Sequence, residues 1–359
     1  MQQKFRRVSR LCVVVLSFGL VGPAVERVAA ASPAATPTLT QTGTKKGVAK
    51  AKPRRYSASA SRSRRARLAR ARAVARVRQW REVAQPRFKM SDSGEWVPDV
   101  RAAAAIIYDP ETNEVLWESN SQDPRSIASI TKVMTASVIF ENNPDLTREV
   151  TIERADVSHA NHTYVRAGER VTIDDLLHLT LVASDNAAAR ALARTSPLGT
   201  SGFVDRMNEK ALELGLEHTT YADSSGLLSA NVSSAYDMAR LIAFASNDER
   251  VSSIMRKAHH TVLTSRRVVN INSTNQLLAK GDVDVRAGKT GFITKSGYCL
   301  ATLLRLPQTN QQVAVVVLGA RSNAGRFMET RHLFNWLSGR MQALNLLSTA
   351  PQPVPQSQE

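Results

Sequence analysis

A lysine placed one helical turn after a serine is the most informative pair in this sequence. Ser129 and Lys132 are three positions apart, and no other lysine in the chain has a serine at that distance before it. Apolar residues recur after Ser129 with helical spacing, which predicts a buried helix that begins at or just before the serine. Both side chains would then share one face. Burial would lower the pKa of Lys132, so that its amine could take the serine proton and make Ser129 a nucleophile.

Serine and lysine often share a helix face, so support is needed from elsewhere in the chain. The triplet Ser184-Asp185-Asn186 separates two apolar helical stretches, at residues 176–183 and 187–193. The Ser-x-Asn pattern also occurs at residues 229–231 and 273–275, so the pattern itself says little. Its position says more, because a polar group among buried residues requires bonding partners. We therefore expect Ser184 and Asn186 to belong to a functional network.

A third group, Lys289-Thr290-Gly291, leads into apolar residues 292 and 293, as an inner strand would. A similar triplet, Lys295-Ser296-Gly297, falls between two apolar runs, where a hairpin turn is expected. Glycine at position 291 would let a substrate backbone approach the strand. Lys289 would supply positive charge for a substrate carboxylate.

The elements that must position these residues can be read from the remaining pattern. A hairpin is expected at residues 102–108 and 114–118, followed by a largely helical middle third. Three strands and a closing helix are then expected at residues 288–293, 297–306, 312–319 and 325–344. The sequence therefore predicts an α/β protein of the α+β type, in which an antiparallel sheet is flanked by helices and carries an inserted helical subdomain.

The first 31 residues are typical of a secretory signal, with basic residues before an apolar run at 11–25 and small residues up to Ala31. The run is too short for a spanning helix, which needs roughly 20 apolar residues. We expect cleavage near Ala31, a periplasmic location, and neither a transmembrane domain nor a C-terminal anchor. The mature chain would comprise a basic low-complexity extension at 32–95, a peptidase domain at 96–345 and a disordered tail at 346–359. The extension is expected to be mostly disordered, with a basic helix at 62–82 as the alternative.

The formal net charge of +17 is concentrated in the N-terminal part. Residues 32–93 contain seventeen basic and two acidic residues, whereas the chain from residue 94 onward is close to neutral. The extension could contact an anionic membrane or wall surface. No nucleic-acid partner is expected, because the export signal argues against one.

Several other kinds of chemistry are not indicated. The chain has no Gly-x-Ser-x-Gly elbow, no His-Glu-x-x-His and no phosphate-binding glycine loop. The pairs His159/His162 and His259/His260 are expected to be ordinary surface residues. Cys299 lies in an apolar stretch and is expected to be a buried hydrophobe. We therefore expect no metal and no cofactor.

Taken together, Ser-x-x-Lys, Ser-x-Asn and Lys-Thr-Gly occur in the order that penicillin-binding proteins and serine β-lactamases share. The similarity covers about residues 99–340 and includes the phrases at 126–136 and 225–227. The chain resembles low-molecular-mass D-alanyl-D-alanine carboxypeptidases and endopeptidases. It is most similar to the periplasmic endopeptidase branch. Two features indicate this: the sequence at residues 297–300 and the short sequence that follows the last predicted helix. The resemblance implies the penicillin-binding/β-lactamase-like transpeptidase fold and hydrolysis of peptidoglycan after D-alanine.

The resemblance also implies catalytic roles. Ser129 would be acylated, with Lys132 as its base. Ser184 and Asn186 would relay protons and orient the substrate amide. Lys289 would support that relay.

The same resemblance implies a substrate-binding strand that comprises Lys289, Thr290, Gly291 and Phe292. Thr290 would help to hold the terminal carboxylate of the substrate. The backbone N–H groups of Ser129 and Phe292 would form the oxyanion hole. The substrates would be peptidoglycan peptide stems, and β-lactam antibiotics would be covalent inhibitors.

Three alternatives remain open at this level. A D-alanyl-D-alanine carboxypeptidase would use the same residues, since both reactions break an amide after D-alanine. A β-lactamase of the most similar class would need a loop glutamate followed four residues later by asparagine, and neither Glu209 nor Glu213 has one. A non-catalytic wall-binding protein would not be expected to keep all three motifs.

Overall fold

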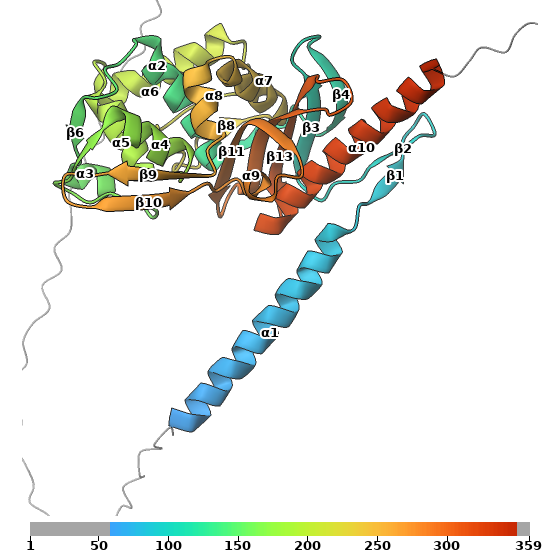
Figure 1. The fold of residues 1–359 in the computed structure, drawn as a ribbon, viewed down its shortest axis with the longest axis horizontal. Helices are drawn as coiled ribbons and strands as arrows, with labels where there is room; N and C mark the ends of the chain where they lie inside the picture. The colour runs from blue at the N-terminus through green and yellow to red at the C-terminus, as the bar shows by residue number, and fades with distance from the viewer. Residues whose placement is uncertain (1–57, 350–359) are drawn as a thin grey trace, which may run out of the picture. The chain divides into compact units, whose positions relative to one another are not determined.

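The computed structural model describes residues 58–349 and has a five-stranded antiparallel sheet at its centre (Figure 1). The strand order is β11-β12-β13-β3-β4. The strands are β3 (Ala104–Asp109), β4 (Glu114–Ser119), β11 (Asp284–Ile293), β12 (Gly297–Arg305) and β13 (Gln312–Ala320). The opening hairpin and the three late strands expected from sequence are thus confirmed, as is the turn at Lys295-Ser296-Gly297.

The sheet is buried on both faces because its side chains alternate between two apolar clusters. Along β13, Val313, Val315 and Val317 pack in the cluster that contains Phe327 and Leu337 of α10 (Asn323–Thr349). The intervening side chains belong to the cluster on the opposite face: Ala314, Val316 and Leu318. This period of two is the consequence of an extended backbone. It explains why the strand contains an almost unbroken apolar run.

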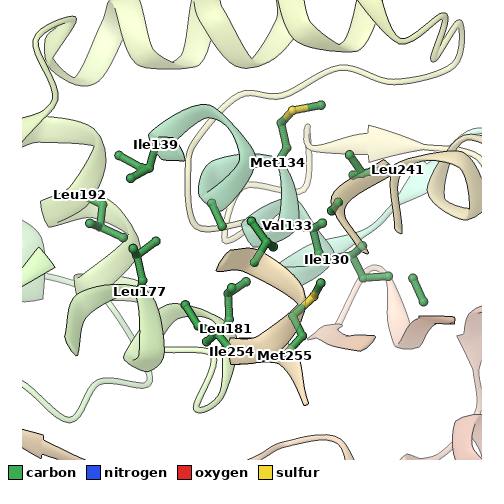
Figure 2. Close-up of a cluster of buried hydrophobic side chains, with 14 of the residues drawn as sticks. Ile130, Val133, Met134, Ile139, Leu177, Leu181, Leu192, Leu241, Ile254 and Met255 are labelled. Atoms are coloured by element: carbon green, nitrogen blue, oxygen red, sulfur yellow. The ribbon is translucent and has the colours of Figure 1, made fainter. Parts of the chain in front are cut away.

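A helical subdomain covers the face of the sheet opposite α10. Helix α2 lies at its centre, and every residue from Thr131 to Phe140 is buried. Figure 2 shows Ile130, Val133 and Met134 packed among side chains of the surrounding helices. The helices concerned are α2 (Thr131–Glu141), α4 (Ile173–Leu181), α5 (Asn186–Thr195), α6 (Gly199–Glu213), α7 (Ala235–Ser246) and α8 (Glu249–Met255). The helical middle and the inserted subdomain expected from sequence are confirmed.

Smaller elements complete the described part of the chain. Strands β9 (His259–Leu263) and β10 (Val268–Asn272) form a long hairpin that the sequence pattern did not reveal. Its alternation is weak because Leu263 and Val268 are apolar but exposed, whereas the half-buried His260 is polar. The others are β1 (Phe88–Met90), β2 (Trp96–Pro98), β5 (Arg125–Ser126), η1 (Ala128–Ile130), β6 (Glu149–Thr151), α3 (Arg154–Val157), β7 (Arg170–Thr172), β8 (Val232–Ser233) and α9 (Gln276–Lys280).

The basic extension differs from the expected unstructured segment. Residues Ala58–Ala84 form helix α1, and β1 pairs with β2 just after it. Alanine and arginine both have high helix propensity, which explains a helix without a buried face. The predicted signal at 1–31 and most of the tail at 346–359 lie outside the described residues. Between residues 58 and 349, none of the helices has the length and apolar character needed to cross a lipid bilayer.

Candidate active site

Ser129 lies in a tight turn where the 3₁₀ helix η1 leads into α2. The turn is constrained, since Ala128 has a φ of +48°. Gly226 packs directly against it: a Cβ on Gly226 would lie 2.1 Å from the Ala128 carbonyl oxygen and 2.9 Å from the Ser129 nitrogen. Gly226 also has a φ of +78°, which residues with a side chain rarely adopt. Both the lack of space and the backbone conformation therefore require glycine here. Two segments about one hundred residues apart thereby fix the position of the serine.

Lys132 is completely buried one turn below the serine. Its Nζ lies 2.9 Å from Ser129 Oγ and 2.6 Å from Asn186 Oδ1, and it also contacts the Ser225 carbonyl oxygen. Burial lowers the pKa of Lys132 to about 7, although the carboxylates of Asp223 and Asp185 oppose the shift. About half of the amine is therefore neutral at pH 7 and can accept the serine proton.

Asn186 begins α5 and connects that helix to Lys132. Its Nδ2 donates to the Ala160 carbonyl oxygen at 2.7 Å, which orients Oδ1 towards Lys132. Asp185, the middle residue of the triplet, caps α5 by accepting from the Ala188 N–H at 2.9 Å. The middle residue of the triplet therefore holds the geometry of its neighbours.

Ser184 is brought to the site by a left-handed backbone, with a φ of +61°. This conformation is uncommon for a residue with a side chain. Lys289 Nζ donates to Ser184 Oγ at 2.8 Å and to the Thr290 carbonyl oxygen at 2.9 Å. Burial, with Lys132 and Arg326 nearby, holds the pKa of Lys289 well below its ordinary value. A second buried amine, whose charged form is disfavoured, thus faces the site.

Strand β11 passes very close to the serine turn. A Cβ on Gly291 would lie 2.5 Å from the Ile127 carbonyl oxygen, so the glycine accommodates the serine turn. This differs from the expected reason, which was room for substrate. Thr290 Oγ1 lies 2.6 Å from Thr274 Oγ1, which places two hydroxyls side by side on this strand edge.

These segments enclose a cleft of about 560 Å³. Lys132 and Lys289 are fully buried and reach it through the serines that they contact. The predicted residues that line the cleft are Ser129, Ser184, Asn186, Thr290, Gly291 and Phe292. The structure therefore brings together all the candidate residues named from sequence.

The cleft also contains residues that sequence reasoning missed: Asn161, His162, Leu227, Thr274 and Arg326. The Arg326 guanidinium donates to the carbonyl oxygens of Gly291 at 2.9 Å and Cys299 at 3.1 Å. No local sequence pattern identifies Arg326, because α10 and β11 are brought together only when the sheet folds. His162 was expected to be plain surface, and it lies at the cleft wall.

The expectation that His260 is an ordinary surface residue is wrong. Its ring is half-buried and stacks on that of His178 with centroids 3.8 Å apart. His260 Nε2 lies 3.0 Å from Asp175 Oδ1, and His178 Nε2 lies 2.8 Å from Lys257 Nζ. Ligand-type atoms of Asp174, His178 and His260 lie within 4.8 Å of one another. An ion lies in the plane of each histidine ring that binds it, and two stacked rings have no such point in common. We therefore interpret this cluster as a hydrogen-bonded network that joins α4 to β9. Cys299 is buried as expected.

A cleft-lining serine with a buried lysine one turn along the helix, and a second lysine and serine opposite, defines a serine acyl-transfer site. On an antiparallel sheet with a helical insertion, this arrangement is that of the penicillin-binding peptidases. The chain belongs to the peptidase family S11, described as D-alanyl-D-alanine carboxypeptidase, which residues 91–322 match.

Similar proteins of known name agree with this membership. A D-alanyl-D-alanine endopeptidase of Haemophilus influenzae is 33% identical over 64% of this chain and 80% of its own length. A D-alanyl-D-alanine endopeptidase of Escherichia coli is 30% identical over 67% of this chain and 78% of its own length. The carboxypeptidase DacF of Bacillus subtilis is 30% identical over 61% of this chain and 57% of its own length.

Solved structures show the same fold. The Streptomyces K15 DD-transpeptidase is 25% identical, with a TM-score of 0.62 over 67% of this chain and 97% of that one. A penicillin-binding protein homologue from Mycobacterium tuberculosis, at 22% identity, shares the fold with a TM-score of 0.60 over 72% and 95%. The predicted family and fold are thereby confirmed.

Proposed function

We propose that this chain is a serine-type D-alanyl-D-alanine peptidase that cleaves peptidoglycan through an acyl-enzyme. The observation that carries the proposal is the contact between Lys132 Nζ and Ser129 Oγ at 2.9 Å, where burial lowers the lysine pKa to about 7. A base that is half neutral at pH 7 suits a serine nucleophile. Membership of family S11 supports the same substrate class.

In the proposed reaction, neutral Lys132 accepts the Ser129 proton while Oγ attacks the carbonyl carbon of D-alanine. The backbone N–H groups of Ser129 and Phe292 stabilise the oxyanion. Collapse of the intermediate breaks the C–N bond and leaves an ester on Ser129. The leaving amine takes the proton that Lys132 accepted, relayed through Ser184 and Lys289, so that Lys132 is neutral again for the hydrolysis step. Water then hydrolyses the ester and restores the serine.

Substrate binding is proposed to follow strand β11. Thr290 and Thr274, with hydroxyls 2.6 Å apart, hold the carboxylate on the leaving side of the bond, and the Arg326 guanidinium, which also lines the cleft, contributes positive charge. Asn186 orients the substrate amide. β-Lactams would acylate Ser129 in the same way, and slow hydrolysis would trap them.

We further propose that the scissile bond lies in a cross-bridge, so that the enzyme is an endopeptidase. The support is similarity to proteins named endopeptidases, 30–33% identical over about four fifths of their length. Carboxypeptidase activity is the second candidate, supported by the family description and by DacF.

Purified cross-linked and monomeric muropeptides distinguish the two reactions. Mass analysis after digestion should show dimers converted to monomers without loss of terminal D-alanine. Trimmed pentapeptides alone would replace the endopeptidase by a carboxypeptidase. Fluorescent penicillin labelling of Ser129→Ala is the companion test, and persistent labelling would rule out this nucleophile.

We propose export to the periplasm, with residues 96–345 as the peptidase domain, and contact of the basic extension with an anionic surface. Helix α1 contains nine arginines and one glutamate, and all its described side chains except that of Ala84 are exposed. Binding to anionic vesicles or isolated wall should fall with salt and with removal of residues 58–84. Equal binding to neutral vesicles would contradict the proposed contact.

A further inference from the structure

A second hollow, of about 440 Å³, continues the catalytic cleft beyond the end of β11. It is formed by the turn between β11 and β12, by Arg125 of β5 and by the end of β13. Phe292 and Thr294 line both the catalytic cleft and this hollow. The two spaces therefore adjoin, and one extended ligand can occupy both.

The hollow is cationic. Arg125, Lys295 and Arg321 line it, whereas no aspartate or glutamate does. Within residues 58–349, none of the three forms an ion pair shorter than 4.0 Å. Lys295 and Arg321 are exposed, so their charges are available to a ligand. Unpaired cations at the edge of a cleft favour a carboxylate-bearing ligand.

Arg125 is held at the base of the hollow rather than extended into solvent. Its Nε is buried and has no hydrogen-bond partner among the described residues. The arginine packs over Gly319, where a Cβ would lie 3.1 Å from Arg125 Nη2. Gly319 has a φ of +74°, which also favours glycine. The Arg125 guanidinium is therefore packed closely against the backbone at Gly319.

An aromatic pair lies where the hollow and the catalytic cleft meet. Phe292 stacks on Tyr298 with ring centroids 4.2 Å apart, and Phe292 is 49% exposed. A large exposed ring beside a cleft offers apolar contact to an extended peptide. The hollow thus combines one flat apolar wall with a cationic edge.

The order of groups along β11 gives the direction of the substrate, on the proposed function. Thr290 holds the leaving-side carboxylate, and the Phe292 N–H faces the scissile carbonyl. The chain on the acyl side must then continue past Phe292 towards residues 294–297. We infer that this hollow binds the carboxylate-bearing part of the peptide stem that precedes the scissile D-alanine. It would act as a specificity subsite for acidic stems.

The inference can be tested with two matched pentapeptides ending in D-alanyl-D-alanine, together with the cross-linked dimers made from them. One has a free carboxylate on its D-glutamate residue, and the other has the amide at that position. Wild-type enzyme should show a higher kcat/KM for the acidic member, and the preference should shrink as salt rises. Lys295→Glu/Arg321→Glu should lower the acidic-to-amidated ratio about tenfold.

Lys280→Glu is the matched control, because Lys280 is exposed and lines neither space. It should leave the ratio unchanged. Lys295→Ala, with a smaller expected change of about threefold, covers the case in which the double variant does not fold. Fluorescent penicillin labelling shows which variants are folded.

The outcomes separate the subsite from the function. Equal rates on both substrates in wild type, or an unchanged ratio in the folded variants, would overturn the subsite while the peptidase activity stands. If wild-type enzyme cleaves neither series and is not labelled by penicillin, the proposed function fails and the subsite fails with it. A selective loss on acidic stems alone supports the inference.

Discussion

The rate at which Ser129 is acylated should follow the protonation of Lys132. Burial lowers the pKa of this lysine to about 7, from an ordinary value of 10.5. Only the neutral amine accepts the serine proton, so the rate should rise with pH through about 7 and then level off. An ordinary lysine would instead give a rate that still rises at pH 9.

The expected size of the effect follows from the neutral fraction. With a pKa of about 7, roughly one half of Lys132 is neutral at pH 7, about one tenth at pH 6 and about one hundredth at pH 5. A lysine with its ordinary pKa would be neutral in only about one molecule in three thousand at pH 7. Each pH unit below the midpoint should therefore slow acylation about tenfold.

The assay is the second-order rate constant for acylation by a fluorescent penicillin between pH 5 and 9. Lys132→Arg should lose about a thousandfold at pH 7.5, because a guanidinium stays protonated. Lys210→Arg is a suitable control, since Lys210 forms ion pairs with Glu141 and Glu213 that arginine can keep. A flat profile in the wild-type enzyme, or near-normal acylation of Lys132→Arg, would refute the reasoning.

Further predictions concern the groups around this pair. Asp223→Asn should move the midpoint of the acylation profile to lower pH, because the Asp223 carboxylate raises the pKa of Lys132; an unmoved or higher midpoint would contradict this. Gly226→Ala should abolish penicillin labelling and lower the free energy of unfolding by about 3 kcal/mol or more, since its Cβ would overlap the serine turn. Gly339→Ala, where nothing lies within 4 Å, is its control in denaturant unfolding and should be slightly stabilising. Burial lowers the pKa of His178 in the folded state, so the unfolded chain takes up that proton more readily. The stability that His178 contributes is present above about pH 6.5 and is lost as the pH falls below that value. The melting temperature should therefore fall less steeply between pH 7 and 5 in His178→Asn than in wild type. An equally steep fall in the two proteins would argue against this.

Local sequence patterns were enough to predict most of the framework. The strands of the main sheet could be placed because an apolar run beside turn residues is a local property. The helix after Ser129 could be placed because its apolar spacing is also local. The order of the three motifs then indicated which family the chain resembles. The hairpin β9–β10 was missed because Leu263 and Val268 are apolar at exposed positions, which blurs the alternation. Helix α1 was missed because composition favoured a disordered segment.

The site itself depends on contacts between residues that are far apart in sequence. Gly226 presses on the serine turn, and Arg326 reaches β11 from the last helix. The pKa of Lys132 is set by how completely the surrounding segments exclude water, which no local pattern specifies. The sequence by itself determined which chemical groups were present and on which elements they lie. Only the tertiary structure decided their distances and burial, because both arise from packing several segments around one cleft.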